Sequence, residues 1–116
     1  MILVVDDDDC NRELLFKIVR SSGHEAIKAS NGLEAVAIFR SRPDSIDLVI
    51  TDLKMPMMDG NEAVRRIRET RPNVAIVCVS GDSERERPAG TRFLSKPFTV
   101  GQLRSCVSEA LAVHVQ

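Results

Sequence analysis

The sequence predicts an α/β fold, a doubly wound parallel sheet of five strands with helices on both faces. Short apolar runs alternate with helical patterns along the chain, and this alternation favours an open parallel sheet. The apolar runs are continuous, which is typical of strands that are buried on both faces. Right-handed crossover connections limit the strand order to a few doubly wound topologies. With 116 residues, 43% of them hydrophobic, the chain suits one domain with its own core.

Each predicted element follows from a local pattern. The predicted strands are the apolar runs Met1–Val5, Leu48–Ile50 and Val74–Val79, together with two weaker runs, Ala26–Ala29 and Arg92–Ser95. The predicted helices carry apolar residues at helical spacing and are Asn11–Ser22, Leu33–Arg40, Asn61–Thr70 and Thr99–Val113. Glycine or proline follows the first three helices, and Thr99 is a suitable N-cap for the last.

Composition excludes several classes of protein. The 16 basic and 17 acidic residues give a net charge of -1, which argues against direct nucleic-acid binding because such modules carry a basic surplus. No apolar run approaches the ~20 residues of a membrane span, and no signal peptide precedes the first predicted strand. The three cysteines are odd in number and far apart, which suits a reducing compartment, so we expect a cytoplasmic protein.

Charged and hydroxyl side chains follow the predicted strands, at the edge where open α/β sheets bind ligands. They are Asp6–Asp9, Asp52, Ser80 and Lys96. Two carboxylates ~4 Å apart repel by about 4 kcal/mol at an effective dielectric constant of about 20, so a bound cation or a proton is needed between them. Oxygen ligands suit Mg²⁺. An acidic cleft with a cation, a lysine and a hydroxyl resembles a phosphoryl-transfer site, in which a carboxylate would be the nucleophile.

Four motifs extend this interpretation to a family. They are ILVVDDD at Ile2–Asp8, LVITDLKMPMMDG at Leu48–Gly60, VCVSG (whose cysteine is Cys78) ending at Gly81, and FLSKPF at Phe93–Phe98. In these motifs and in their order, the chain resembles the receiver domain of two-component response regulators over residues 1–116. The resemblance implies a flavodoxin-like (βα)5 fold. It also implies that the domain accepts a phosphoryl group and switches conformation.

The resemblance assigns roles to the residues at the acidic edge. Asp52 would be the phosphoacceptor. Asp7 would hold Mg²⁺ directly and Asp6 through water, while Asp52 and the backbone carbonyl of Lys54 complete the ligands. We expect self-catalysed phosphorylation and slow autodephosphorylation, rather than an enzyme acting on a separate substrate.

Three further residues receive roles from the same resemblance. Lys96 would pair with the phosphoryl oxygens, and the Lys96-Pro97 peptide bond is expected to be cis. Ser80 would donate its hydroxyl to the phosphoryl group, and Phe93 would be the aromatic residue that turns inward on activation. The implied partner is the phosphohistidine of a sensor kinase or of a histidine phosphotransfer domain.

The segment Gly81–Arg92 departs from the family pattern. Pro88 and Gly90 leave room for about one helical turn between Ser83 and Arg87, so the fourth helix should be truncated or absent. In this respect the chain is similar to receivers attached to hybrid sensor histidine kinases. The oligomeric state stays open, because the missing helix belongs to a surface that many receivers use for dimerisation.

Other interpretations of the same residues remain open. A pseudo-receiver would bind partners without taking phosphate. A haloacid-dehalogenase-like aspartyl phosphatase needs a second acid two residues after its nucleophile, where this chain has Lys54, and an FMN module needs a phosphate loop where it has four aspartates. We expect Asp8 or Asp9 to cap the first helix, and Asp59-Gly60 to form a turn. Lys54 and Asp82 are expected to pair at the rim of the cleft.

Overall fold

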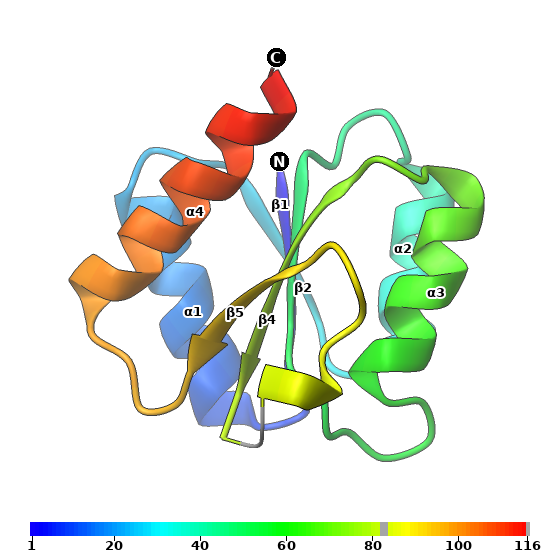
Figure 1. The fold of residues 1–116 in the computed structure, drawn as a ribbon, viewed down its shortest axis with the longest axis horizontal. Helices are drawn as coiled ribbons and strands as arrows, with labels where there is room; N and C mark the ends of the chain where they lie inside the picture. Colours follow the sequence, from blue (N-terminus) through cyan, green and yellow to red (C-terminus); the bar gives the residue numbers. More distant parts are fainter. Residues whose placement is uncertain (82–83, 116) are drawn as a thin grey trace.

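The computed structural model describes residues 1–81 and 84–115, which form a five-stranded parallel sheet between two layers of helices (Figure 1). The strands are β1 (Ile2–Val5), β2 (Ala26–Ala29), β3 (Leu48–Thr51), β4 (Ala75–Ser80) and β5 (Arg92–Ser95). The helices are α1 (Asp9–Ser21), α2 (Gly32–Ser41), α3 (Gly60–Thr70) and α4 (Val100–Val115), and a 3-10 turn, η1, spans Glu84–Glu86. The predicted fold class is confirmed, and the predicted ends of the elements lie within two residues of those observed.

The sheet has the strand order β2-β1-β3-β4-β5, with every pairing parallel. Helices α1 and α4 cover one face, and α2 and α3 cover the other (Figure 1). Strands β1, β3 and β4 are buried along their whole length, as continuous apolar runs predict for central strands of a parallel sheet. The chain therefore folds as a doubly wound sheet whose strands all end at the same edge.

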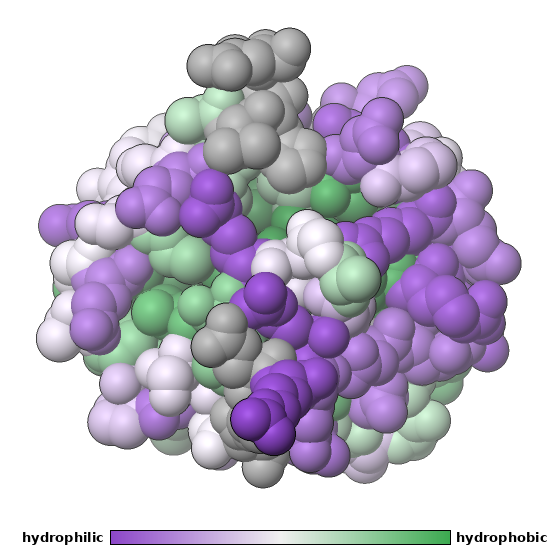
Figure 2. Space-filling view, in the orientation of Figure 1, coloured by the Kyte–Doolittle hydropathy of each residue, from purple (hydrophilic) through white to green (hydrophobic). Residues whose placement is uncertain are grey.

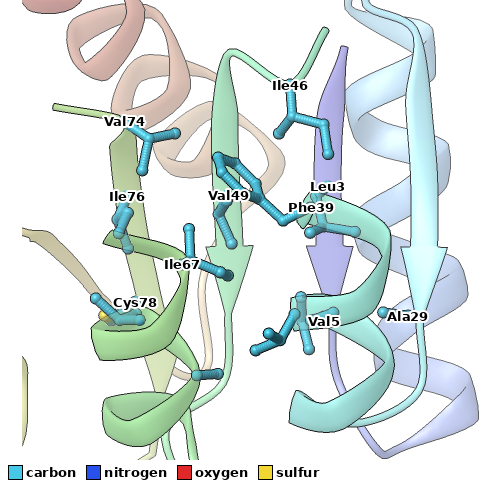
Figure 3. Close-up of a cluster of buried hydrophobic side chains, with 14 of the residues drawn as sticks. Leu3, Val5, Ala29, Phe39, Ile46, Val49, Ile67, Val74, Ile76 and Cys78 are labelled. Carbon is cyan, nitrogen blue, oxygen red and sulfur yellow. The ribbon is translucent and has the colours of Figure 1, made fainter. Parts of the chain in front are cut away.

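The pleat of each strand divides its side chains between two apolar cores. In β1, Leu3 and Val5 face the layer of α2 and α3, whereas Ile2 and Val4 face the layer of α1 and α4. Phe39 of α2 is fully buried in the first core, among side chains from the sheet and α3 (Figure 3). The outer surface near α3 is hydrophilic by contrast (Figure 2). Burial on both faces makes the central strands a rigid base for the loops that follow them.

Capping side chains fix where the helices begin. Asp8, Asn31 and Asp59 precede α1, α2 and α3, and each side chain accepts a hydrogen bond from a backbone N–H in the first turn. Thr99 and Gln102 exchange hydrogen bonds between side chain and backbone at the start of α4. The expected cap of the first helix is thus Asp8, and α1 starts earlier than predicted because this cap lies directly after the β1 edge.

In the described part of the connection from β4 to β5, the one helical element is the short turn η1, so the prediction of a truncated fourth helix is confirmed. Asn61 of α3 donates a hydrogen bond from Nδ2 to the carbonyl oxygen of Glu86 at 2.9 Å. Thr91, just before β5, donates from Oγ1 to the carbonyl oxygen of Pro88 at 2.8 Å. The first bond ties the segment to the start of α3, and the second closes a local turn before β5. Within the described residues, no helix has both the length and the hydropathy that crossing a bilayer requires.

Candidate functional site

The carboxyl edge of the sheet brings together residues from three strands. Asp6 follows β1 and Asp52 follows β3, and these strands are neighbours with Val5 opposite Thr51. The backbone N–H of Asp52 donates to the carbonyl oxygen of Val5 at 3.1 Å, which continues the ladder past the end of the strands. The two carboxylates are therefore placed by sheet register and not by a flexible loop.

Lys96 reaches both carboxylates from the end of β5. Its Nζ atom lies 3.3 Å from Oδ2 of Asp6 and 3.2 Å from Oδ2 of Asp52. The Lys96 side chain is 23% exposed and the Asp6 side chain 1%. The Lys96-Pro97 bond is cis, as predicted, and the Lys96 N–H donates to the carbonyl oxygen of Ser80 at 2.9 Å. One ammonium thus bridges two carboxylates that are remote in sequence.

The two oxygens of the Asp52 carboxylate have different surroundings. Oδ1 accepts hydrogen bonds from the backbone N–H of Leu53 at 2.7 Å and of Lys54 at 3.4 Å. Oδ2 is the oxygen that faces Lys96. The Thr51 hydroxyl donates to the Asp52 carbonyl oxygen at 2.9 Å, which ties down the backbone of the same residue. The carboxylate is held in one orientation, with Oδ2 turned into the cleft.

The electrostatics of the cluster reflect burial and repulsion. Burial raises the pKa of Asp6, and the Asp52 carboxylate adds to this rise, while the Asp8 N–H and Lys96 oppose it. Burial alone would lower the pKa of Lys96, but the two carboxylates outweigh burial and raise it. Lys96 is therefore held in its charged form by its partners, whereas ionisation of Asp6 costs free energy in the folded state.

The cluster offers an oxygen-only donor set for a cation. Asp6, Asp7 and Asp52 each contribute a carboxylate oxygen, and these three atoms lie within 4.8 Å of one another. Asp7 is exposed, whereas Asp6 and Asp52 are buried. Hard oxygen donors and an excess of negative charge fit Mg²⁺, which keeps water among its ligands and uses few protein carboxylates. The residues present are thus suited to the ion that the sequence led us to expect.

The other predicted residues border this cluster in different ways. Ser80 is buried at the end of β4, the strand between those that carry Asp52 and Lys96. Phe93 of β5 lies opposite Cys78 and packs partly buried against the core that faces α2 and α3. Lys54 pairs through Nζ with the Glu86 carboxylate at 3.2 Å. Its expected partner Asp82 lies outside the described residues, and its carbonyl as a metal ligand stays a prediction.

Two residues of the site escaped the sequence analysis. Gly60 appeared there only as part of a turn, yet a Cβ atom at this position would lie 2.2 Å from the carbonyl oxygen of Asp52 and 2.8 Å from Cα of Leu53. Its N–H also donates to the Leu53 carbonyl oxygen at 2.8 Å. Arg12 donates from Nη1 to the carbonyl oxygen of Asp6 at 2.9 Å. The glycine at the first position of the third helix was a sequence signal for the close contact at Gly60. The sequence contains no signal for the bond from Arg12 to the Asp6 carbonyl oxygen.

Comparisons with known proteins agree on one family. The family model described as the response regulator receiver domain matches residues 2–108. The sensor kinase CckA of Brucella abortus is 35% identical over 116 residues, which cover 95% of this chain and 12% of the kinase. Sporulation initiation phosphotransferase F of Bacillus subtilis is 34% identical, with 95% of this chain and 92% of that protein covered. Among solved structures, the CheX-CheY complex of Borrelia burgdorferi with BeF3 and Mg²⁺ matches with a TM-score of 0.88 at 29% identity, covering 93% of this chain and 86% of that one.

The close approach at Gly60 gives a first test. Gly60→Ala should lower the free energy of unfolding by about 2 kcal/mol or more, because the new methyl group meets the backbone of Asp52 and Leu53. Gly101→Ala is the matched control, since a Cβ atom there meets nothing closer than 3.9 Å; it should be neutral or stabilising by up to about 1 kcal/mol. Urea denaturation measures both. Equal effects of the two substitutions would show that the contact with Asp52 is unimportant.

The crowded carboxylates give a second test, made without divalent cations. Asp6→Asn should raise the melting temperature at neutral pH, by roughly 4 °C for a gain of about 1 kcal/mol, because it removes one of the like charges. The raised pKa means that the folded protein binds this proton more tightly than the unfolded chain does, so wild-type stability falls as pH rises through that pKa. The advantage of Asp6→Asn should therefore shrink on acidification.

The matched control for this test is Asp44→Asn, which removes an exposed carboxylate. It should change the melting temperature little at any pH, because surface charges far from the cluster contribute little. Scanning calorimetry between neutral and mildly acidic pH compares the two variants with wild type. A lower melting temperature for Asp6→Asn at neutral pH would mean that the Asp6–Lys96 attraction outweighs the repulsion.

Proposed function

This chain belongs to the response regulator receiver family, the phosphoacceptor domains of two-component signalling, and from that premise we propose that Asp52 accepts a phosphoryl group in a Mg²⁺-dependent reaction. The donor is a phosphohistidine of a sensor kinase or of a histidine phosphotransfer domain. The observation that carries the proposal is the bridging of Asp6 and Asp52 by Lys96, beside three carboxylates arranged for a cation.

Each residue of the cluster has a part in the transfer. Oδ2 of Asp52 attacks the phosphorus atom, since Oδ1 is engaged by two backbone N–H groups. The P–N bond to the donor histidine breaks, and the imidazole leaves with the electron pair. Lys96 already lies against Oδ2 and can pair with the phosphoryl oxygens, while Ser80 at the end of β4 donates its hydroxyl to them. Asp6, Asp7 and Asp52 would hold the cation, which would neutralise charge on the transferring group.

The relatives support this proposal, and their lengths show how much of a whole kinase this chain would represent. The Borrelia complex contains Mg²⁺ together with BeF3, a cation and an anionic group of the kinds that this cluster suits. Kinases and phosphotransfer proteins are among the curated relatives. The chain spans only 12% of the length of the Brucella kinase, so membership of a hybrid kinase is itself a proposal.

We also propose a cytoplasmic location, and self-catalysed phosphorylation in place of turnover of a separate substrate.

An apolar surface beside the cleft suits contact with the donor protein. A hollow of about 340 Å³ is lined by Asn11, Leu14, Lys96, Pro97 and Phe98. Leu14 of α1 is 48% exposed there, and Lys96 borders both the hollow and the carboxylate cluster. A protein that places a phosphohistidine over Asp52 would cover this surface. The occupant proposed is a helix of the histidine phosphotransfer or kinase domain, which would bury Leu14.

The phosphorylation proposal is tested by intact mass. With Mg²⁺ and acetyl phosphate, the wild-type chain should gain one phosphoryl group that is stable in acid and labile in base. Asp52→Asn should abolish the gain, because the amide cannot attack phosphorus as a carboxylate does. Lys96→Met should slow phosphorylation by about 100-fold or more, as removal of one preorganised stabilising group typically does.

Two controls decide the meaning of the result. Asp47→Asn changes an exposed carboxylate that is paired with the terminal amine, and it should leave the mass gain intact. A wild-type chain that gains no mass with either acetyl phosphate or phosphoramidate would instead support the pseudo-receiver, which binds partners without being modified. A mass gain on Asp52→Asn equal to that of wild type would refute Asp52 as the acceptor.

The partner surface is tested by comparing two kinds of donor. Leu14→Ala should slow phosphotransfer from a histidine phosphotransfer domain that is active on the wild type, by about tenfold, because truncation of a central apolar contact costs about 1–2 kcal/mol. Phosphorylation by acetyl phosphate should not change. Leu33→Ala is the control, since Leu33 on α2 is also 48% exposed. If both leucine variants accept phosphate from the protein donor as fast as wild type, the partner does not use this hollow.

A further inference from the structure

We infer that Arg12 is a positioning residue for the cation site, because its guanidinium holds the peptide group that joins Asp6 to Asp7. The inference rests on the proposed function in that it takes these aspartates as cation ligands. Arg12 itself would touch neither the cation nor the phosphoryl group. Its effect would be carried by the backbone between the two ligands.

The guanidinium of Arg12 acts as a two-armed fork: its two terminal nitrogens bind two different residues of the β1–α1 region. The side chain starts in the first turns of α1 and returns to the end of β1, where Nη1 donates to the Asp6 carbonyl oxygen at 2.9 Å. Nη2 forms an ion pair with the Asp9 carboxylate. The Arg12 side chain is only 15% exposed, although it is a long cation near the surface. Burial of the fork indicates that its orientation is fixed by packing.

The other polar groups of Asp6 are held by separate elements. Its N–H donates to the carbonyl oxygen of Ala29 in β2 at 3.3 Å, and its Oδ1 accepts from the Asp8 N–H at 2.9 Å. Oδ2 accepts from Lys96. The bond from Arg12 to the carbonyl oxygen joins this set, and it acts on the peptide plane that leads into Asp7. Because Asp7 is exposed, the direction of its carboxylate depends on that plane.

Positioning and simple charge predict opposite effects on cation affinity. A guanidinium near the cluster repels a divalent cation, so if Arg12 acted only as a charge, its removal would strengthen Mg²⁺ binding. If Arg12 holds the Asp6–Asp7 peptide, its removal would let the carboxylates separate and would weaken binding. Loss of a partner that orients a metal ligand typically costs 10- to 100-fold in affinity. The direction of the change therefore distinguishes the two roles.

The experiment measures Mg²⁺ affinity of the unphosphorylated full chain, by titration calorimetry and by the rise of melting temperature with Mg²⁺ concentration. Arg12→Gln should bind Mg²⁺ about tenfold more weakly than wild type. Arg12→Lys, which keeps the charge but loses the fork, should fall between them. Arg20→Gln is the control, since Arg20 lies in the last turn of α1 over the ring of Phe16 and its removal changes the net charge equally.

The outcomes separate the inference from the function on which it rests. Unchanged or tighter Mg²⁺ binding by Arg12→Gln, with wild type binding the ion, would overturn the positioning role and leave the phosphoacceptor proposal intact. A wild-type chain that does not bind Mg²⁺ would instead refute the proposed cation site. If Arg12→Gln melts too low to be measured, Arg12→Lys decides: affinity equal to that of wild type overturns the inference, and weaker affinity at an unchanged metal-free melting temperature supports it.

Discussion

The repulsion between carboxylates gathered at one edge of the sheet is the constraint on which the rest of this structure depends. Asp6 and Asp52 are forced together because β1 and β3 are neighbours in register, and Asp7 follows at once. Lys96, at the end of β5, offsets part of this negative charge. Gathering these charges costs free energy, and under the proposed function a bound cation would offset that cost and help the site to take a phosphoryl group.

Such a cluster stays in place only if its backbone cannot relax. The buried strands provide a stiff base, and short loops provide the remaining restraints. Asp8 and Asp59 cap the helices directly after the edge, so the loops end where the helices begin. Gly60 lets the start of α3 contact the carbonyl of Asp52, and Arg12 holds the carbonyl of Asp6. The backbone of the acidic residues is thus restrained by Gly60 and Arg12, which add no negative charge to the cleft.

The shortened connection between β4 and β5 changes the rim of the cleft. In place of a full helix, η1 lies against the β3–α3 region, where Lys54 contacts the Glu86 side chain and Asn61 contacts its backbone. Figure 2 shows an apolar area between β5 and α4, and a hollow lined in part by Phe93, Leu94 and Cys106 lies there. The β5 edge of the sheet is therefore less covered than its centre, because β5 is only partly buried whereas β3 and β4 are buried along their whole length.

The sequence by itself determined the sheet, the helices and the identity of the strand-end residues. Continuous apolar runs and capping residues are local signals backed by large burial energies, so the doubly wound fold and the clustering of Asp6, Asp52 and Lys96 could be predicted. The tertiary structure alone decided which groups support them. Lys54 pairs with Glu86, a partner that the sequence did not indicate, and Arg12 reaches a backbone carbonyl. Such contacts depend on the path of short loops, and an exposed ion pair contributes at most about 1 kcal/mol, too little to leave a pattern in sequence.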